Sequence, residues 1–235
     1  MFLSNRDIKW AIDCGKLIVY PRPEACKPPK GYDETSIDLH LAPVDDARVW
    51  DLTELGRSDK ARGRRTENGP EVSIGTLVWD SISAEYQKPV PRESIDSQGN
   101  KRLVYRKDNE IIVRRFGFLL WTTKEEIGTP RVTPGLVESH RHPELICFVN
   151  AKSTKARTGL LVHFTAPTFH AGWSGKVTLE IANLGPFTLV LKEDDALAQL
   201  TVATISSAPD LSLKKEKSKT QGQTDPSGAP REKAT

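Results

Sequence analysis

Residues 160–205 read LLVHFTAPTFHAGWSGKVTLEIANLGPFTLVLKEDDALAQLTVATI, and the spacing of their apolar residues indicates the fold class. Apolar and polar side chains alternate over short runs, which is the period of a half-buried β-strand. In the run Lys176 to Ile181, three apolar residues fall on one face and Glu180 falls on the other. Glycine, proline, asparagine and aspartate separate the runs, and this punctuation predicts many short strands in a barrel or sandwich.

The same pattern continues on the N-terminal side of that stretch. Ile37, Leu39 and Leu41 alternate with polar residues, so this segment is predicted to be a half-buried strand. Further strands are predicted at Phe116 to Thr122, Leu145 to Val149, Leu160 to Phe164, Phe187 to Leu191 and Ala196 to Ile205.

One short helix is predicted before the strands, from Ser4 to Gly15. Ser4 can cap the amide three residues on, Asp7 can return the bond, and the glycine provides a left-handed stop. Helical spacing places several apolar residues on one face, which is expected to pack on the core. These residues are Ile8, Ala11 and Ile12.

Three polar segments are expected to lie outside the core. Arg57 to Gly69 and Pro89 to Asn109 are predicted surface excursions, and the second is expected to form a hairpin turning near Gln98-Gly99-Asn100. Residues 209–235 contain few apolar side chains, so burial cannot offset the cost of ordering them and a flexible tail is expected. The sequence therefore predicts one domain over residues 1–208, followed by this tail.

Composition limits the class of protein and of partner. Of 235 residues, 37% are hydrophobic and 28% are charged, and the formal net charge is +3. Such a small charge argues against nucleic acid as the partner and is compatible with a small anionic ligand. Charges begin at Arg6, and no apolar run approaches the roughly 20 residues of a membrane span, so neither a signal peptide nor membrane attachment is expected.

The cysteines indicate the compartment. Cys14, Cys26 and Cys147 are odd in number and widely spaced, which is typical of free thiols in a cytoplasmic protein rather than of a disulfide framework.

Several kinds of site are excluded by missing motifs. The chain has no GxxxxGK[ST] phosphate loop and no GxGxxG after a strand. Zinc deaminases hold their metal with an HxE and a CxxC, and this chain has no CxxC. His140 and His142 could supply half of a metal site, but a solvated loop fits their alternate spacing better.

The segment Lys152 to Gly159 combines hydroxyls, cations and a glycine, which suits the binding of a triphosphate. A segment of this composition before a strand is, however, more often an ordinary turn.

Glu180 has two interpretations as well. Periodicity favours a solvent-facing glutamate, whereas a pocket on its face of the strand would make it a candidate general base.

These segments together resemble the dCTP deaminase branch of the dUTPase-like family. Lys152 to Gly159 is similar to the RSSxARxG motif of that branch, and Val162 to Ala166, Ala171 to Gly175 and Thr178 to Glu180 continue the match in register. Lys219 to Gln223 is similar to the closing KYxxQ segment. The opening of the chain also matches, at Leu3 to Ile8, Gly15 to Leu17, Pro21 to Pro23 and Ser36 to Leu39.

The resemblance implies a distorted β-barrel or jelly-roll that forms a homotrimer with sites at the subunit interfaces. It implies hydrolytic deamination of dCTP to dUTP and ammonia without zinc, with Mg²⁺ carried in by the triphosphate. Glu180 would be the general acid and base, and burial in a dry pocket would move its pKa toward neutrality. Ser153 and Arg157 would position the water and stabilise charge, with Arg157 reaching across an interface.

The resemblance also implies a set of substrate-binding residues. Backbone groups near Phe164 and Ala166 would read the pyrimidine edge. Thr154, Lys219 and Gln223 would hold phosphates. The complete predicted set is Lys152, Thr154, Phe164, Ala166, His170, Trp173, Lys219 and Gln223.

Three positions depart from the family pattern. His170 replaces an Asp that handles the attacking water in dUTPases, Thr220 replaces a Tyr, and Lys152 replaces an Arg. The missing Asp favours a deaminase over a dUTPase. Two alternatives remain open: a bifunctional deaminase–diphosphatase or dUTPase that gives dUMP, and a non-catalytic nucleotide-binding regulator.

Overall fold

A computed structural model describes residues 1–25, 31–51, 63–66, 69–72, 79–130, 145–207, 209 and 220–226. The helices are α1 (Asn5–Asp13), α2 (Trp79–Tyr86) and α3 (Ser153–Ala156), with 3-10 turns at Pro23–Ala25 and Val44–Asp46. The strands are β1 (Ile18–Tyr20), β2 (Ser36–His40), β3 (Arg48–Trp50), β4 (Gly63–Thr66), β5 (Gly69–Val72), β6 (Gln87–Pro89), β7 (Val104–Lys107), β8 (Glu110–Val113), β9 (Phe118–Gly128), β10 (Leu145–Ala151), β11 (Leu160–Val162), β12 (Thr168–Phe169), β13 (Ser174–Asn183), β14 (Leu189–Lys192) and β15 (Ala196–Thr204).

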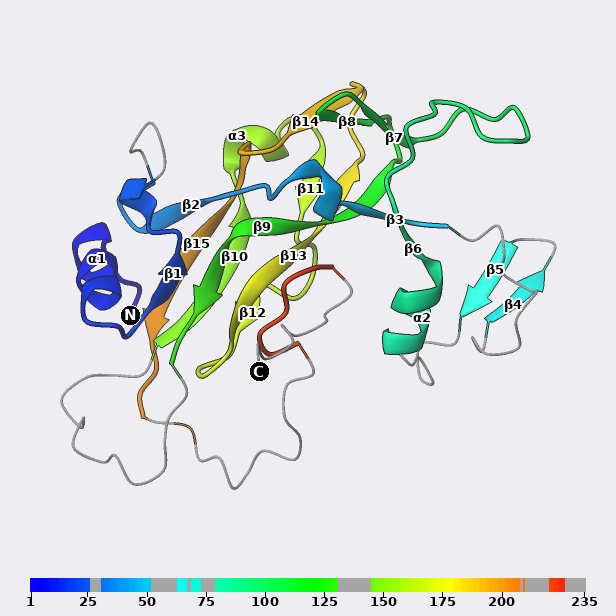
Figure 1. Cartoon of the computed structure of the whole chain (residues 1–235). Coiled ribbons are helices and arrows are strands. Elements are labelled where there is room, and N and C mark those ends of the chain that lie inside the picture. The colour runs from blue at the N-terminus through cyan, green and yellow to red at the C-terminus, as the bar shows by residue number, and fades with distance from the viewer. Residues whose placement is uncertain are drawn as a thin grey trace.

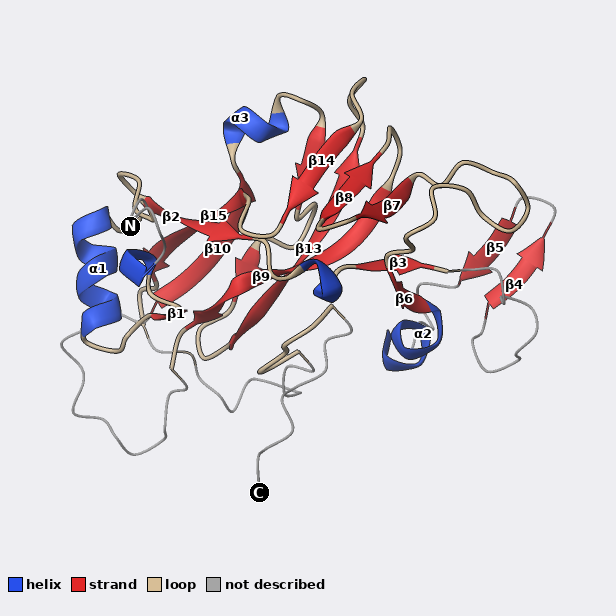
Figure 2. Cartoon of the chain, turned by 45° about the horizontal axis from the view of Figure 1, so that its top comes forward, coloured by secondary structure: helices blue, strands red, loops and turns tan. Residues whose placement is uncertain are grey.

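The strands form two large sheets and two small ones. The largest has the order β11-β13-β9-β3-β6, with β1 also paired to β9, and the second has the order β12-β10-β15-β2. A smaller sheet contains β14-β8-β7, and β4 pairs with β5. The pairings that build the two large sheets are antiparallel. Figures 1 and 2 show α1 at one end of the molecule and the β4–β5 pair at the other, with α2 next to that pair.

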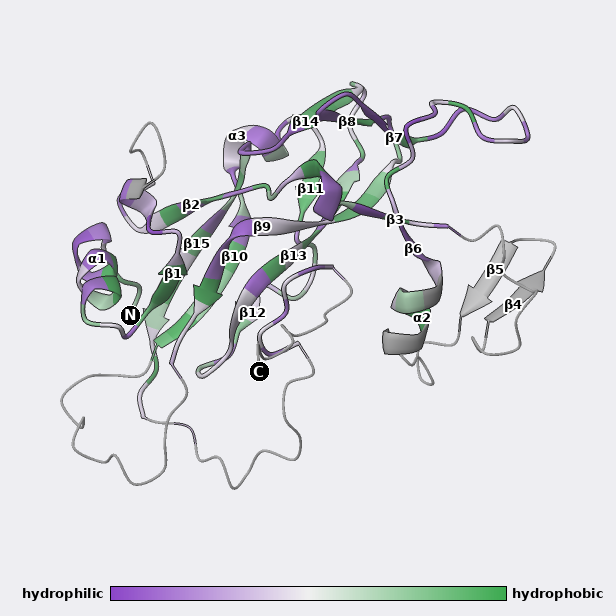
Figure 3. Cartoon of the chain, in the orientation of Figure 1, coloured by the Kyte–Doolittle hydropathy of each residue, from purple (hydrophilic) through white to green (hydrophobic). Residues whose placement is uncertain are grey.

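One apolar core joins the two large sheets. It takes Trp121 and Leu179 from the first sheet and Leu39 and Leu200 from the second, and all four are fully or almost fully buried. In Figure 3 the hydrophobic colour lies mainly along the strands of these sheets. Within the described ranges, each sheet ends in edge strands instead of closing on itself. The mainly β prediction is confirmed, and the architecture is a distorted sandwich rather than a closed barrel.

The predicted N-terminal helix is confirmed with shorter bounds. The Ser4 hydroxyl accepts a bond from the Asp7 amide, as expected of a cap, and itself donates to the Asp7 carboxylate at 2.8 Å. This second bond replaces the expected return from Asp7 to the backbone. Gly15 has the left-handed φ of +72°, and Ile8 lies on the buried face.

Among the strands that were predicted, β9 differs most in its bounds, because it runs to Gly128 instead of ending at Thr122. The apolar patterns did not predict β1, β3 to β8, β12 or the helices α2 and α3. Its second half is polar, which hid it from the apolar alternation. Thr123 and Glu125 are nevertheless buried. The Thr123 hydroxyl donates to the Glu125 carbonyl, and the Glu125 carboxylate accepts from the backbone amide and ring of His40. Partners elsewhere in the fold therefore make a polar strand possible here.

The two excursions have different outcomes. The second one forms the predicted hairpin turn: the Asp96 carboxylate accepts from the amides of Gln98 and Asn100, and Gly99 has a φ of +85°. The expectation that the whole segment lies outside the core was wrong, because Val90 and Val104 near its ends are buried in the core. Of the segment Arg57 to Gly69, the structure describes only parts, in which β4 pairs with the beginning of β5.

The tail is described only at residue 209 and over residues 220–226. Residues 220–226 lie against β13. The Gly222 amide donates to the Ser174 carbonyl at 2.7 Å, and the Lys176 amide donates to the Gln223 carbonyl at 3.0 Å. The predicted boundary after residue 208 is not tested. Among the described residues, no helix has the length and apolar character needed to cross a membrane.

Candidate active site

A cavity of about 440 Å³ opens on the face of β13 opposite the core. Four phenylalanine and tryptophan side chains, which come from three strands and a loop, form its apolar wall. Histidine, glutamate and tail residues form a polar edge. The lining residues are Trp50, Phe118, Leu120, His163, Ala166, Thr168, Phe169, His170, Trp173, Thr178, Glu180, Thr220, Gln223 and Pro226.

Glu180 is placed in this cavity by the period of strand β13. Its neighbours Leu179 and Ile181 point into the core and are fully buried, so the glutamate side chain points to the opposite face. That face is the cavity wall, and the Glu180 side chain keeps 36% of its surface exposed. The structure therefore favours the interpretation as a pocket residue over that of a glutamate on an open surface.

His163 is the direct partner of this glutamate. Its ring Nδ1 lies 3.0 Å from Glu180 Oε2, and its Nε2 lies 2.8 Å from the Ala166 carbonyl oxygen. The His163 backbone amide also donates to the Glu180 carbonyl at 3.0 Å. Both ring nitrogens of His163 are thus held by neighbouring groups, and the backbone of the residue is held as well.

The electrostatics of Glu180 correct one expectation. Burial does raise the pKa of its carboxyl, as predicted. The hydrogen bond and charge of His163, with backbone bonds from Glu180 and Phe164, outweigh that effect and hold the pKa below its ordinary value. The predicted upward shift was therefore wrong, because the sequence argument contained no partner for the carboxylate.

The aromatic walls suit a flat, apolar group. The Phe169 ring is nearly parallel to the His163 ring, with an interplanar angle of 18° and centroids 5.5 Å apart. Trp173 lies against Phe169 at 4.8 Å. Aromatic surfaces of this kind can enclose a planar ring, while the nearby polar atoms orient it.

The tail closes one side of the cavity. Gln223 is buried, and its side-chain amide donates to the Lys176 carbonyl at 2.6 Å and lies 3.4 Å from the Thr178 hydroxyl. The Trp173 indole N–H points to the Thr220 carbonyl and hydroxyl, both at 3.2 Å. In this arrangement the Gln223 amide, predicted to hold phosphate, is bonded to the protein. Lys219 lies outside the described residues.

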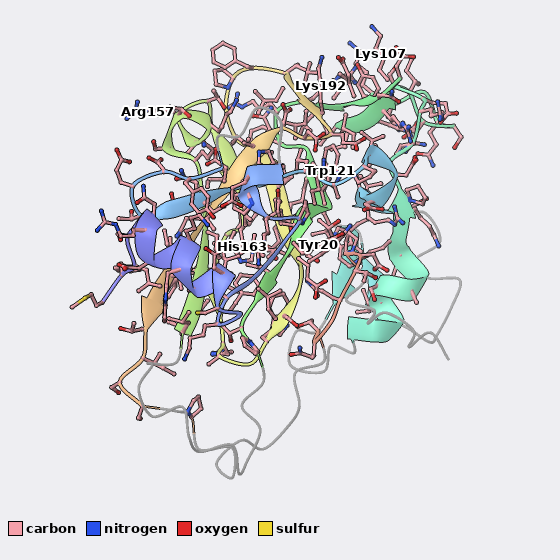
Figure 4. All side chains as sticks on the ribbon, turned by 60° about the vertical axis from the view of Figure 1, so that its left-hand side comes forward. Tyr20, Lys107, Trp121, Arg157, His163 and Lys192 are labelled. Carbon is pink, nitrogen blue, oxygen red and sulfur yellow. The ribbon has the colours of Figure 1, made fainter. Side chains whose placement is uncertain are left out.

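Four other predicted residues lie elsewhere in the subunit. Ser153, Thr154 and Arg157 are exposed on or beside α3 and do not line the cavity. Figure 4 shows Arg157 at the periphery, apart from His163. The Lys152 ammonium lies 2.5 Å from Asp38 Oδ1, so a phosphate would compete with that carboxylate.

The remaining predicted residues lie at or beside the cavity. Ala166, His170 and Trp173 line it. Phe164 lies at its edge, where its ring packs on Phe118 with centroids 6.0 Å apart. Sequence reasoning missed His163, although a polar residue inside the apolar run after Leu160 was a signal for it.

The expectation of no metal ligands stays a prediction. Over the described ranges, no group of three His, Cys, Asp or Glu side chains is arranged to hold a metal ion. His140 and His142 lie outside these ranges, as does Cys26, while Cys14 and Cys147 are free thiols.

Comparison with known proteins identifies the family. A family model described as dCTP deaminase-like matches residues 79–205. A dCTP deaminase of Natronomonas pharaonis is 26% identical over 227 residues, covering 96% of this chain and 92% of the relative. A dUMP-forming dCTP deaminase of Halobacterium salinarum is 30% identical over 173 residues, covering 74% and 76%. A crystal structure of the 2'-deoxycytidine 5'-triphosphate deaminase of Agrobacterium tumefaciens aligns with a TM-score of 0.49 and 15% identity, covering 86% of this chain and 47% of that one. Because the matched segment makes up more than half of the sequence, this chain belongs to the dCTP deaminase-like family.

Proposed function

We propose that this protein hydrolyses the exocyclic amine of dCTP, giving dUTP and ammonia. The observation that carries the proposal is the Glu180 carboxylate in an aromatic-walled cavity, which Ala166 also lines, in a member of this family. The walls would enclose the cytosine ring. The backbone would read its polar edge, and the carboxylate would move the protons.

The proposed reaction uses one carboxylate twice. Glu180 accepts a proton from water as the water oxygen forms its bond to C4 of the ring. It passes this proton to ring nitrogen N3, whose double bond to C4 becomes a single bond. It then takes the proton of the new C4 hydroxyl and gives it to the amine nitrogen, so that the C4–N bond breaks, ammonia leaves and the C4 carbonyl of uracil remains. The pKa of Glu180, which is held below its ordinary value, favours the ionised form that the first step needs. Zinc has no part in this mechanism, and Mg²⁺ would arrive on the triphosphate.

The proposed site is shared between subunits of a homotrimer. Support comes from α3, which presents Ser153 and Arg157 on the surface outside the cavity of their own subunit. Exposed apolar side chains lie around the edge strand β11 next to α3, where a second copy could cover them. They include Leu161, Phe164 and Leu184. Residues from one α3 would then hold the water in the next subunit's cavity.

Mixing two inactive variants tests the shared site. Trimers that combine Arg157→Ala and Glu180→Gln subunits should regain part of the activity, because some interfaces then contain both intact residues. A lack of any rescue in verified mixed trimers would place both residues in the site of one subunit.

A second candidate is the bifunctional reaction that continues to dUMP, since the Halobacterium salinarum relative is dUMP-forming. His170 on the cavity wall, in the place of the family's Asp, argues against cleavage of the triphosphate here.

We also propose a cytoplasmic location and a small-molecule substrate rather than nucleic acid. A net charge of only +3 agrees with the small-molecule substrate.

Product analysis separates these candidates. Purified protein is incubated with dCTP and Mg²⁺, and nucleotides are resolved by chromatography, with Glu180→Gln as the matched control. The proposal expects dUTP and ammonia from the parent and unchanged dCTP from the variant. Accumulation of dUMP with pyrophosphate supports the bifunctional reaction, and unchanged dCTP in both samples contradicts enzymatic activity.

A further inference from the structure

The environment of His163 is more specific than a packing role requires. Its side chain is only 5% exposed, and both ring nitrogens lie within hydrogen-bond distance of acceptors. Its backbone φ is +60°, an uncommon conformation for a residue other than glycine. Strained residues that the surrounding structure holds in place are concentrated at functional sites.

The two acceptors fix how many protons the pair contains. The Ala166 carbonyl can only accept, so Nε2 of His163 must carry a proton. Nδ1 faces Glu180 Oε2 at 3.0 Å, and this contact is favourable only with a proton between the two atoms. That proton is on the imidazole, giving an ion pair, or on the carboxyl, giving a neutral pair. In both cases the pair has no net charge.

We propose that His163 is a positioning residue for the deamination, which orients Glu180 and shares one proton with it. This inference rests on the proposed function, because it names the group that prepares its general base. Glu180 must first accept a proton and later release one, and a partner that can hold a proton beside it reduces the cost of both states.

Other ionisable groups near the pair are few. Among the cavity-lining residues that the structure describes, His170 is the remaining titratable side chain. The tail adds Asp225, next to the lining residue Pro226. Neither has a bond to the His163 ring among the contacts found for that ring, so the pH dependence should follow the His163–Glu180 contact.

The first test is the pH profile of kcat/KM for His163→Asn. Asparagine tolerates a positive φ and can still donate to Glu180, but it is neutral and too short to reach Ala166. Without the imidazole that shares the proton, the effect of burial on the pKa of Glu180 is no longer offset. The acid limb of the profile should therefore move to higher pH by roughly 1 to 3 units, the effect of one nearby opposite charge.

A matched control uses the other His–Glu pair of this chain. His40 lies 2.7 Å from Glu125, outside the cavity. His40→Asn should leave the acid limb where it is in the parent. If the His163→Asn profile superimposes on that of the parent, or if His40→Asn moves the limb equally, the positioning role is overturned.

The second test measures which ring nitrogen of His163 carries a proton, and it does not depend on enzymatic activity. Nitrogen NMR of the labelled ring in the resting full-length protein at neutral pH should show a proton on Nε2 of His163. A neutral ring with its proton on Nδ1 and a bare Nε2 would overturn the inference. If the ring result holds but the parent makes no dUTP, the proposed function fails and the shared proton stands. If the parent deaminates dCTP and the ring result fails, only the inference is lost.

Discussion

Two histidine–glutamate pairs in this protein have nearly the same chemistry but different surroundings. In the pair between the sheets, His40 Nδ1 lies 2.7 Å from Glu125, which is almost completely buried and also accepts from the His40 backbone. In the cavity pair, Glu180 is partly exposed and faces space that a ligand can enter. The first pair joins β2 to β9, and the second offers a carboxylate for chemistry. A pair marks a candidate site only when open space adjoins it.

The largest expected effect is on turnover. Glu180→Gln keeps the size and hydrogen bonding of the side chain but removes the proton acceptor, so deamination should fall by about 10² to 10⁴-fold while dCTP still binds. Glu125→Gln should retain turnover within a few fold. Steady-state kinetics of both variants check this. Turnover of Glu180→Gln within tenfold of the parent would remove Glu180 from the mechanism.

Stability should show the reverse order. Glu125→Ala leaves His40 without its partner in a nearly dry position, and the free energy of unfolding should fall by about 3 kcal/mol. Glu180→Ala should cost less, since its side chain keeps contact with solvent. Urea denaturation of the two variants measures the difference. Equal losses would show that both carboxylates have the same structural role.

Removing the tail should weaken dCTP binding at the cavity and leave the His40–Glu125 pair unchanged. Truncation after Ser207 deletes the bonds of Thr220 and Gln223 to the cavity wall, and about tenfold weaker dCTP binding is expected from the loss of a few hydrogen bonds. The unfolding midpoint of the folded core should change little. Binding measured by calorimetry at full parental affinity would exclude the tail from the site.

The smallest expected effect is the pH dependence of the pair between the sheets. The hydrogen bond with Glu125 holds the pKa of His40 above its ordinary value, against the effect of burial. The stabilisation is therefore complete below the unfolded pKa of about 6.5 and disappears as pH rises through the folded pKa. The difference in unfolding free energy between the parent and His40→Asn should shrink with rising pH. A difference that grows with pH would reverse the assignment.

Sequence patterns predicted the parts of the fold that depend on local periodicity. Alternation placed Glu180 opposite the core face, and the cap at Ser4 and the turn at Gly99 follow from residue type. The second half of β9 escaped prediction because its polar residues are paired with distant ones. Glu125, for example, is bonded to His40, 85 positions away.

The site was harder to predict than the fold for the same reason. Period alone gives the direction of Glu180 but not the cavity, whose walls come from segments as distant as Trp50 and Thr220. The contact of His163 with Glu180 spans 17 positions and needs a positive φ that no pattern indicated. The resemblance to known deaminases identified the carboxylate but not this partner.

The most direct test of the account is to follow the oxygen that replaces the amine. The protein is incubated with dCTP and Mg²⁺ in water enriched in heavy oxygen, and the nucleotides are analysed by mass spectrometry. The proposed mechanism predicts dUTP with one heavy oxygen at the C4 carbonyl of the uracil base and an unlabelled triphosphate, and no such product from Glu180→Gln. A heavy oxygen on phosphate with the cytosine amine retained, or no labelled product at all, would contradict it.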